Sequence, residues 1–149
     1  MNILFVCLGN ICRSPLAEGI MKELYAERNL PGVIESAGTA DFNIGRAADY
    51  RSIAVAKEFG IDISKHRARQ LLKSDFERFD RIFGMDSYNI ACILKTAPGE
   101  NAKRKVALIG DDFEIADPYT SDIKAFRETY RLLRMHCEDK ILLHPKLLG

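Results

Sequence analysis

A cysteine and an arginine six positions apart are the side chains of this sequence best suited to chemistry. They lie in the segment Val6-Cys7-Leu8-Gly9-Asn10-Ile11-Cys12-Arg13-Ser14-Pro15. A thiolate is a strong nucleophile where N–H groups and a cation stabilise it, and the planar guanidinium of Arg13 fits two oxygens of a phosphate. Gly9 and Asn10 tolerate a left-handed backbone, so the loop can turn successive N–H groups inward around an anion. The segment therefore predicts an anion site with Cys7 as its nucleophile.

Such a loop needs a strand before it and a helix after it. Residues 3–7 form an uncharged apolar run, which is typical of a strand buried on both faces. Ser14 and Pro15 suit the N-cap and first turn of a helix, and apolar residues follow at helical spacing from Leu16. The start of this helix would add free N–H groups to the anion site, and Ser14 could donate its hydroxyl to the Cys7 thiolate. No Gly-Lys-Ser/Thr sequence follows, which excludes a Walker-type phosphate loop.

The rest of the sequence alternates between strand and helix signals. Further strands are predicted over residues 33–37, 81–84 and 105–109. Further helices are predicted over residues 49–59, with Gly60 just beyond the end, and over residues 86–95. A last helix, expected to stop at Pro145, has an apolar stripe made of Ile123, Phe126, Tyr130, Leu133, Cys137 and Ile141. The alternation predicts an α/β, three-layer fold: a four-stranded parallel sheet with helices on both faces, right-handed crossovers, and a ligand site beyond the carboxyl end of the first strand.

Length and composition narrow the class of protein. The 149 residues predict one domain, residues 1–149, which is large enough to bury a core without the disulfides or metal ions that small domains need. The net charge of +1 gives no reason to expect a nucleic-acid or membrane partner. The N-terminal apolar run has no basic residues before it, and four scattered cysteines do not suggest a disulfide scaffold, so we expect a cytoplasmic protein. No cysteine–histidine spacing fits zinc, so no metal is expected.

The ten-residue segment resembles the signature of the low-molecular-weight protein tyrosine phosphatases. Four further stretches match the same family: Glu35-Ser36-Ala37-Gly38-Thr39, His66-Arg67-Ala68-Arg69-Gln70-Leu71, Met85-Asp86 and Asp117-Pro118-Tyr119. The resemblance extends over essentially the whole chain. It implies one domain with a four-stranded parallel sheet, and hydrolysis of phosphotyrosine in proteins or of small aryl phosphates. It also implies no cofactor, and we expect a monomer.

The resemblance gives each residue of the loop a role. Cys7 would attack phosphorus and form a phosphocysteine, while Arg13 would bind the phosphate. The other phosphate-binding residues would be Leu8, Gly9, Asn10, Ile11, Cys12 and Ser14.

The same resemblance makes Asp117 the general acid and then the general base, which suits a carboxyl group at the carboxyl edge of a sheet. By itself, Asp117 before a proline would indicate a turn, and Asp111 and Asp112 would be competing acids. Phe42 and Tyr119 would be the aromatic walls that hold the substrate ring, although either could be a core aromatic.

Three more residues would support the loop. Ser36 and His66 match positions that hydrogen-bond Asn10 in the family, whereas His66 by itself would be interpreted as a solvated surface residue. Asp86 matches an acid near Arg13, and it is also a natural N-cap for the following helix.

Two alternatives share some of these features. A thioredoxin-coupled arsenate reductase has the same fold and loop, but it needs two further cysteines close together in the sequence, whereas Cys92 and Cys137 lie far apart. A module that only binds phosphotyrosine would have no need of the full set of nucleophile, arginine and acid. Because Cys7 and Cys12 share one tight loop, a reversible disulfide between them under oxidation is a further hypothesis.

Overall fold

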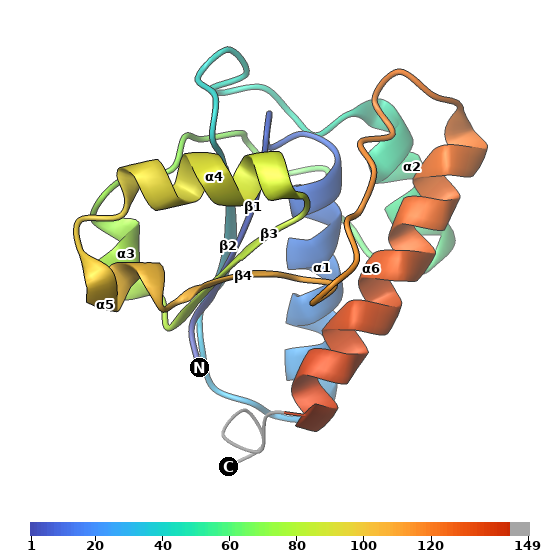
Figure 1. Ribbon diagram of the computed structural model, residues 1–149. Coiled ribbons are helices and arrows are strands. Elements are labelled where there is room, and N and C mark those ends of the chain that lie inside the picture. The colour runs from blue at the N-terminus through green and yellow to red at the C-terminus, as the bar shows by residue number, and fades with distance from the viewer. Residues whose placement is uncertain (144–149) are drawn as a thin grey trace.

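The computed structural model describes residues 1–143, and its strands and helices alternate along the chain (Figure 1). The strands are β1 (Ile3–Cys7), β2 (Ile34–Gly38), β3 (Arg81–Gly84) and β4 (Val106–Leu108). The helices are α1 (Arg13–Glu27), α2 (Tyr50–Glu58), α3 (Asp75–Arg78), α4 (Ser87–Thr96), α5 (Glu100–Lys103) and α6 (Ile123–Leu143). The predicted stop at Pro145 lies outside the described residues.

The four strands form one parallel sheet in the order β2-β1-β3-β4. In this register, Phe5 of β1 lies between Ser36 of β2 and Phe83 of β3. The chain goes from β1 to one side of the sheet and then to the other, so the strand order reverses at β1. This reversal leaves a crevice at the carboxyl end of β1, where ligands bind in folds of this type.

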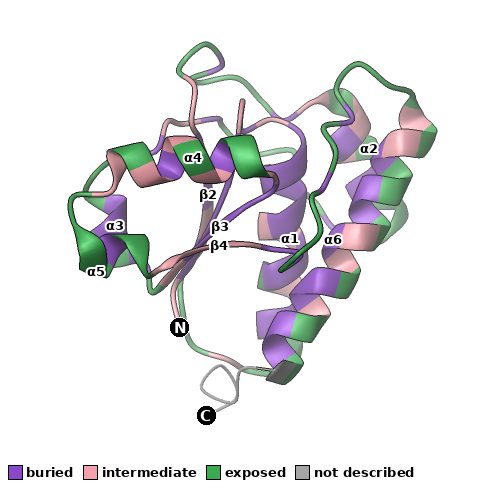
Figure 2. Cartoon of the chain, in the orientation of Figure 1, coloured by how far each residue is buried: buried purple, intermediate pink, exposed green. Residues whose placement is uncertain are grey.

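Helices cover both faces of the sheet, which confirms the predicted three-layer α/β fold. In Figure 1, α1 and α6 lie side by side on one face, and α3, α4 and α5 lie on the other. The side chains of β1 alternate between two apolar cores: Ile3 and Phe5 face the α1 and α6 side, and Leu4 and Val6 face the α4 side. Burial on both faces explains why this run is uncharged. Figure 2 shows α6 buried along its side toward α1 and exposed on the other.

The predicted apolar stripe of α6 is confirmed. Five of its residues are buried in the core with α1, namely Phe126, Tyr130, Leu133, Cys137 and Ile141, while Ile123 is partly buried against them. Gly60 has φ +79° and follows Phe59, the C-cap of α2, as predicted for the residue just beyond the end of this helix.

Some predicted boundaries are wrong, chiefly the start of α1. The N-cap position is Cys12 and the helix begins at Arg13, so Ser14 is not the cap. The hydroxyl of Ser14 instead contacts Cys7 and Asn10. The sequence also gave no indication of α3 and α5, since helices of four residues are too short to show a periodic pattern. The predicted bounds of β1 and β3 are confirmed, and those of β2, α2, α4 and β4 differ from the structure by one residue at each end. Among residues 1–143, no helix has both the length and the apolarity needed to cross a bilayer.

Candidate active site

The loop after β1 turns at Asn10, which has φ +57° and is fully buried. This is the left-handed conformation that its residue type allows. Gly9 lies outside that region, so the prediction that both residues serve the turn is wrong for Gly9. The backbone of Gly9 instead packs closely against Asn43, because a Cβ at Gly9 would lie 2.5 Å from Nδ2 of Asn43. That Nδ2 donates to the Gly9 carbonyl at 3.2 Å.

Hydrogen bonds from three other segments fix Asn10. Its Nδ2 donates to Oγ of Ser14 at 2.8 Å and to Oγ of Ser36 at 3.0 Å. Its Oδ1 accepts the N–H of Arg69 at 3.0 Å, and its carbonyl accepts Nε2 of His66 at 2.7 Å. Because a carbonyl can only accept, Nε2 of His66 must have a hydrogen. Burial lowers the pKa of His66 against the opposing effects of this hydrogen bond and of Glu18.

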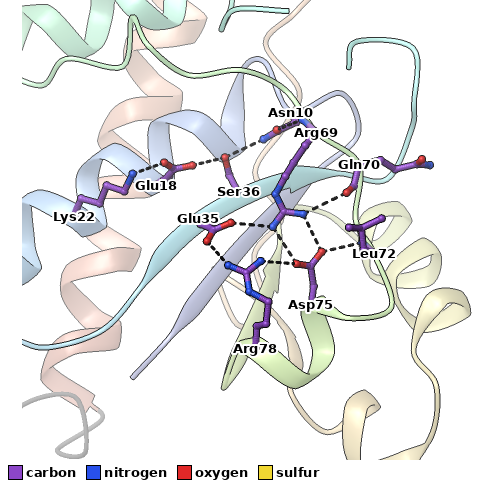
Figure 3. Close-up of polar contacts among 10 residues, drawn as sticks. All are labelled: Asn10, Glu18, Lys22, Glu35, Ser36, Arg69, Gln70, Leu72, Asp75 and Arg78. Atoms are coloured by element: carbon purple, nitrogen blue, oxygen red, sulfur yellow. Dashed lines mark hydrogen bonds and ion pairs between the residues drawn. The ribbon is translucent and has the colours of Figure 1, made fainter. Parts of the chain in front are cut away.

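A network of ion pairs extends behind this loop (Figure 3). The guanidinium of Arg69 donates to both oxygens of the fully buried Asp75, at 2.9 and 3.0 Å, and to Glu35 at 3.2 Å. Arg78 adds a bond of 2.6 Å to Glu35. These contacts hold the main chain at Arg69, whose N–H meets Asn10. The sequence does not indicate this function of Arg69, because only its backbone touches the loop.

Several groups around Cys7 favour a negative charge on its sulfur. The Asn10 N–H donates to Sγ at 3.3 Å, and Oγ of Ser14 lies 3.0 Å from Sγ. Since Asn10 Nδ2 already donates to Oγ of Ser14, the hydroxyl hydrogen is free to point at the sulfur. Cys7 also lies near the N-terminus of α1, where unpaired N–H groups stabilise an anion. Burial, followed by the charge of Asp49, raises the pKa of Cys12 well above the usual range.

The guanidinium of Arg13 is held in place beside the loop, with its side chain only 2% exposed. Its Nη1 donates to Oδ2 of Asp86 and to the carbonyl of Ile115, both at 2.7 Å. Its Nη2 lies 3.8 Å from Oδ2 of Asp117. Asp86 is also the N-cap of α4, where Oδ1 accepts the N–H of Asn89 at 2.7 Å. Both sequence interpretations of Asp86 therefore describe contacts present in the structure.

A cavity of about 370 Å³ opens above the loop. Its described lining is Cys7, Leu8, Gly9, Ile11, Cys12, Arg13, Phe42, Asn43, Arg46, Asp117 and Tyr119. Phe42 is 63% exposed and Tyr119 52% exposed, so neither is a core aromatic. The lining includes Asp117 and neither Asp111 nor Asp112, which separates the three candidate acids.

A wider groove of about 770 Å³ on α6 is lined mainly by charged side chains that are joined in ion pairs, such as Arg127 with Glu58 and Arg134 with Glu23. Its described lining holds no cysteine, so the smaller cavity is the candidate active site.

Comparisons with known proteins agree on one family. The family model described as low molecular weight phosphotyrosine protein phosphatase matches residues 2–144. The Saccharomyces cerevisiae protein of that name is 35% identical over 142 residues, covering 88% of this chain and 87% of the relative. A crystal structure of a protein tyrosine phosphatase from Entamoeba histolytica is 37% identical, with a TM-score of 0.90 and 95% of each chain covered. A Drosophila arginine phosphatase also has a TM-score of 0.90, at 33% identity, covering 96% of this chain and 97% of its own.

Proposed function

Because the chain belongs to the low molecular weight phosphotyrosine protein phosphatase family and is therefore a phosphatase, we propose that it hydrolyses phosphotyrosine-type esters through a phosphocysteine on Cys7. One observation carries the proposal: Cys7, Arg13 and Asp117 line a single cavity that has exposed aromatic rings among its walls. The nucleophile, the phosphate ligand and the acid are thus within reach of one substrate molecule.

The phosphate group would bind in the loop after β1. Its non-bridging oxygens would accept N–H groups of residues 8–13 and the guanidinium of Arg13, which Asp86 and Ile115 hold by Nη1. Exposed Phe42 and Tyr119 would lie on either side of the aryl ring. A site with two aromatic walls fits a flat aryl ring, and it therefore favours phosphotyrosine over the smaller side chain of phosphoserine.

In the first chemical step, the thiolate of Cys7 would attack phosphorus while the bond to the leaving oxygen breaks. Asp117, 3.8 Å from Nη2 of Arg13, would protonate the departing phenolate. In the second step, Asp117 as a carboxylate would take a proton from water, and this water would attack the phosphocysteine. Inorganic phosphate would leave, and the Cys7 thiolate would be restored.

The arsenate reductase alternative has little support. That chemistry needs a pair of cysteines to shuttle a disulfide outward from the loop. Cys92 lies on α4 and Cys137 on α6, and these helices cover opposite faces of the sheet.

A thiolate nucleophile also needs a reducing compartment, from which we infer that the protein acts in the cytoplasm.

The test compares Cys7→Ser with the matched control Cys12→Ser from the same loop. Cys7→Ser should fold, bind vanadate and lose nearly all turnover of an aryl phosphate, whereas Cys12→Ser should stay active. Rapid acid quenching of the wild type with labelled substrate should trap phosphate on Cys7. Substantial turnover by Cys7→Ser would refute the nucleophile.

Substrate class is tested with three substrates: a phosphotyrosine peptide, a phosphoserine peptide and phosphoarginine. We expect the phosphotyrosine peptide to have the highest kcat/KM. The phosphoarginine arm is included because one structural neighbour is an arginine phosphatase. A preference for phosphoarginine would overturn the proposed ester class while leaving the nucleophile untouched.

A further inference from the structure

Arg51, on the first turn of α2, contacts the two segments that meet at the active site. The start of α2 is tied to the phosphate loop, since the N–H of Asp49 donates to the Ile11 carbonyl at 2.8 Å. The hydroxyl of Ser52 donates to the Cys12 carbonyl at 3.3 Å. The N-cap residue Asp49 therefore has a fixed position relative to the loop that contains Cys7.

The carboxylate of Asp49 in turn fixes the guanidinium of Arg51. Its Oδ1 accepts Nε at 3.0 Å, and its Oδ2 accepts Nη2 at 3.0 Å. This is the two-pronged geometry that suits an arginine and a carboxylate. Burial would raise the pKa of Asp49, but the hydrogen bonds and charge of Arg51 lower it below the usual value.

The other side of the same guanidinium holds the segment that contains the acid. Nη2 donates to the Tyr119 carbonyl at 2.9 Å, and Nη1 donates to the Ser121 carbonyl at 2.8 Å. The guanidinium carbon also lies 5.7 Å from the centre of the Tyr119 ring and 4.2 Å from that of Phe126. The Tyr119 N–H donates to Oδ1 of Asp117 at 3.1 Å, so the residue whose carbonyl is held also contacts the acid.

This segment needs such support, because it lies outside the regular elements and the side chain of Asp117 is 43% exposed. Before the acid, the segment is held where Arg13 meets the Ile115 carbonyl. Beyond the acid, Arg51 contributes two further bonds to main-chain carbonyls. A lysine could not replace it, since one ammonium cannot match the planar fork that meets a carboxylate and two carbonyls together.

We propose that Asp49 and Arg51 form a clamp, a pair of positioning residues that sets Asp117 at the correct distance from the phosphate loop. The inference rests on the proposed function, because it takes Asp117 to be the general acid. Arg51 of α2 positions Asp117 by binding main-chain carbonyls of the segment that contains Asp117. The same guanidinium fixes Tyr119, one of the two aromatic walls.

Loss of the clamp should affect proton transfer more than phosphate binding. General acid catalysis is typically worth about 10²–10⁴-fold, and a displacement of about 1 Å can reduce a rate about 10²-fold. We therefore expect Arg51→Met to lower kcat/KM about 10- to 100-fold for esters with basic leaving groups. Activated aryl esters, which leave without a proton, should lose less than about threefold, and inhibition by inorganic phosphate should change little.

The experiment measures kcat/KM over a series of aryl phosphates whose leaving groups differ in pKa. Arg51→Met and Arg51→Lys are compared with Arg127→Met, which removes a similar ion pair between α6 and Glu58 of α2 at 2.9 Å. Both Arg51 variants should show a steeper dependence on leaving-group pKa, and Arg127→Met should follow the wild type. A uniform loss across the series, or an equal steepening in Arg127→Met, would overturn the clamp.

A double variant separates this inference from the proposed function. If Arg51 acts through Asp117, adding Arg51→Met to Asp117→Ala should cause less than about threefold further loss for basic leaving groups. Full multiplication of the two effects would overturn the clamp. If Asp117→Ala steepens the dependence and Arg51→Met does not, the clamp fails and the acid stands. If Asp117→Ala alone gives a uniform loss, the acid assignment fails first, and the clamp with it.

Discussion

Replacement of Asn10 by alanine tests how firmly the phosphate loop is held. The change removes the bonds from Nδ2 to Ser14 and Ser36 and the bond that Oδ1 accepts from Arg69. A hydrogen bond of this kind typically contributes about 0.5–1.5 kcal/mol net. Alanine at φ +57° adds roughly 1 kcal/mol of backbone strain. We therefore expect Asn10→Ala to lower the free energy of unfolding by about 3–5 kcal/mol.

Two further variants separate the hydrogen bonds from the backbone strain. Asn10→Gly loses the same bonds but accepts the left-handed turn. Glycine also raises the conformational entropy of the unfolded chain, which lowers the stability by about 0.4–1 kcal/mol. The loss of stability in Asn10→Gly should therefore be smaller than that in Asn10→Ala by at most roughly 0.6 kcal/mol. Ser36→Ala removes the bond that Ser36 accepts from Asn10 and the bond that its hydroxyl donates to Glu18 at 2.6 Å, and should lower the free energy of unfolding by about 1–3 kcal/mol.

Urea denaturation followed by far-UV circular dichroism measures these differences, since the sequence has no tryptophan to serve as a fluorescent probe. Turnover of an aryl phosphate is measured alongside. Asn10→Ala should also lower kcat, because the Asn10 N–H that meets Sγ of Cys7 at 3.3 Å would lose its position. If the free energy of unfolding of Asn10→Ala is within about 0.5 kcal/mol of the wild-type value and kcat is unchanged, Asn10 does not set the shape of the loop.

Two other predictions concern oxidation and pH. Peroxide should oxidise Cys7 to a sulfenic acid that condenses with the Cys12 thiol to a disulfide, releasing water; dithiol should restore activity in the wild type but far less in Cys12→Ser. Mass spectrometry that finds Cys7 sulfinic acid beside free Cys12 would contradict this. Burial lowers the pKa of His136 from 6.5, so the unfolded state binds more protons below about pH 6.5 and stability should fall there. His136→Gln should reduce that fall in urea titrations at pH 7 and pH 5.5, and equal falls would contradict the assignment.

The fold was largely predictable because its strands differ so clearly from its helices. An uncharged run such as β1 is needed where Ile3 and Leu4 must enter different cores. The long stripe of α6 shows helical periodicity over many turns, and the structure buries it. In contrast, α3 and α5 are single turns whose position depends on packing against the sheet rather than on any local pattern.

The candidate site was predictable in its loop and less so in what surrounds the loop. A cysteine, a left-handed asparagine and an arginine between a strand and a helix are local signals. The need for glycine at Gly9 depends on Asn43, far along the chain, so its cause could not be inferred from the loop alone. The acids Asp111, Asp112 and Asp117 are chemically alike, and a family resemblance singled out Asp117 before the cavity lining did.

Arg51 and Arg69 had no local signal of any kind. Each acts on the site through main-chain groups: Arg51 donates to carbonyls of the acid segment, and the Arg69 N–H meets Asn10. Any residue type has a backbone N–H and carbonyl, so a sequence cannot indicate which of them an arginine will hold. Both would be interpreted as solvated surface charges.

The parts of the site differ in how firmly they are held, and the proposed chemistry explains the difference. The floor is buried and bonded from several segments: Asn10 and Ser14 are fully buried, and Arg13 is tied to Asp86. A nucleophile and a phosphate ligand must be fixed closely, because phosphorus is attacked along one line. The rim is exposed, and there the acid and the aromatic walls must accept leaving groups of different shape. A rim with no anchor would leave the acid misplaced, so a guanidinium bound to backbone carbonyls, such as that of Arg51, fixes the segment while leaving Asp117 open to the substrate.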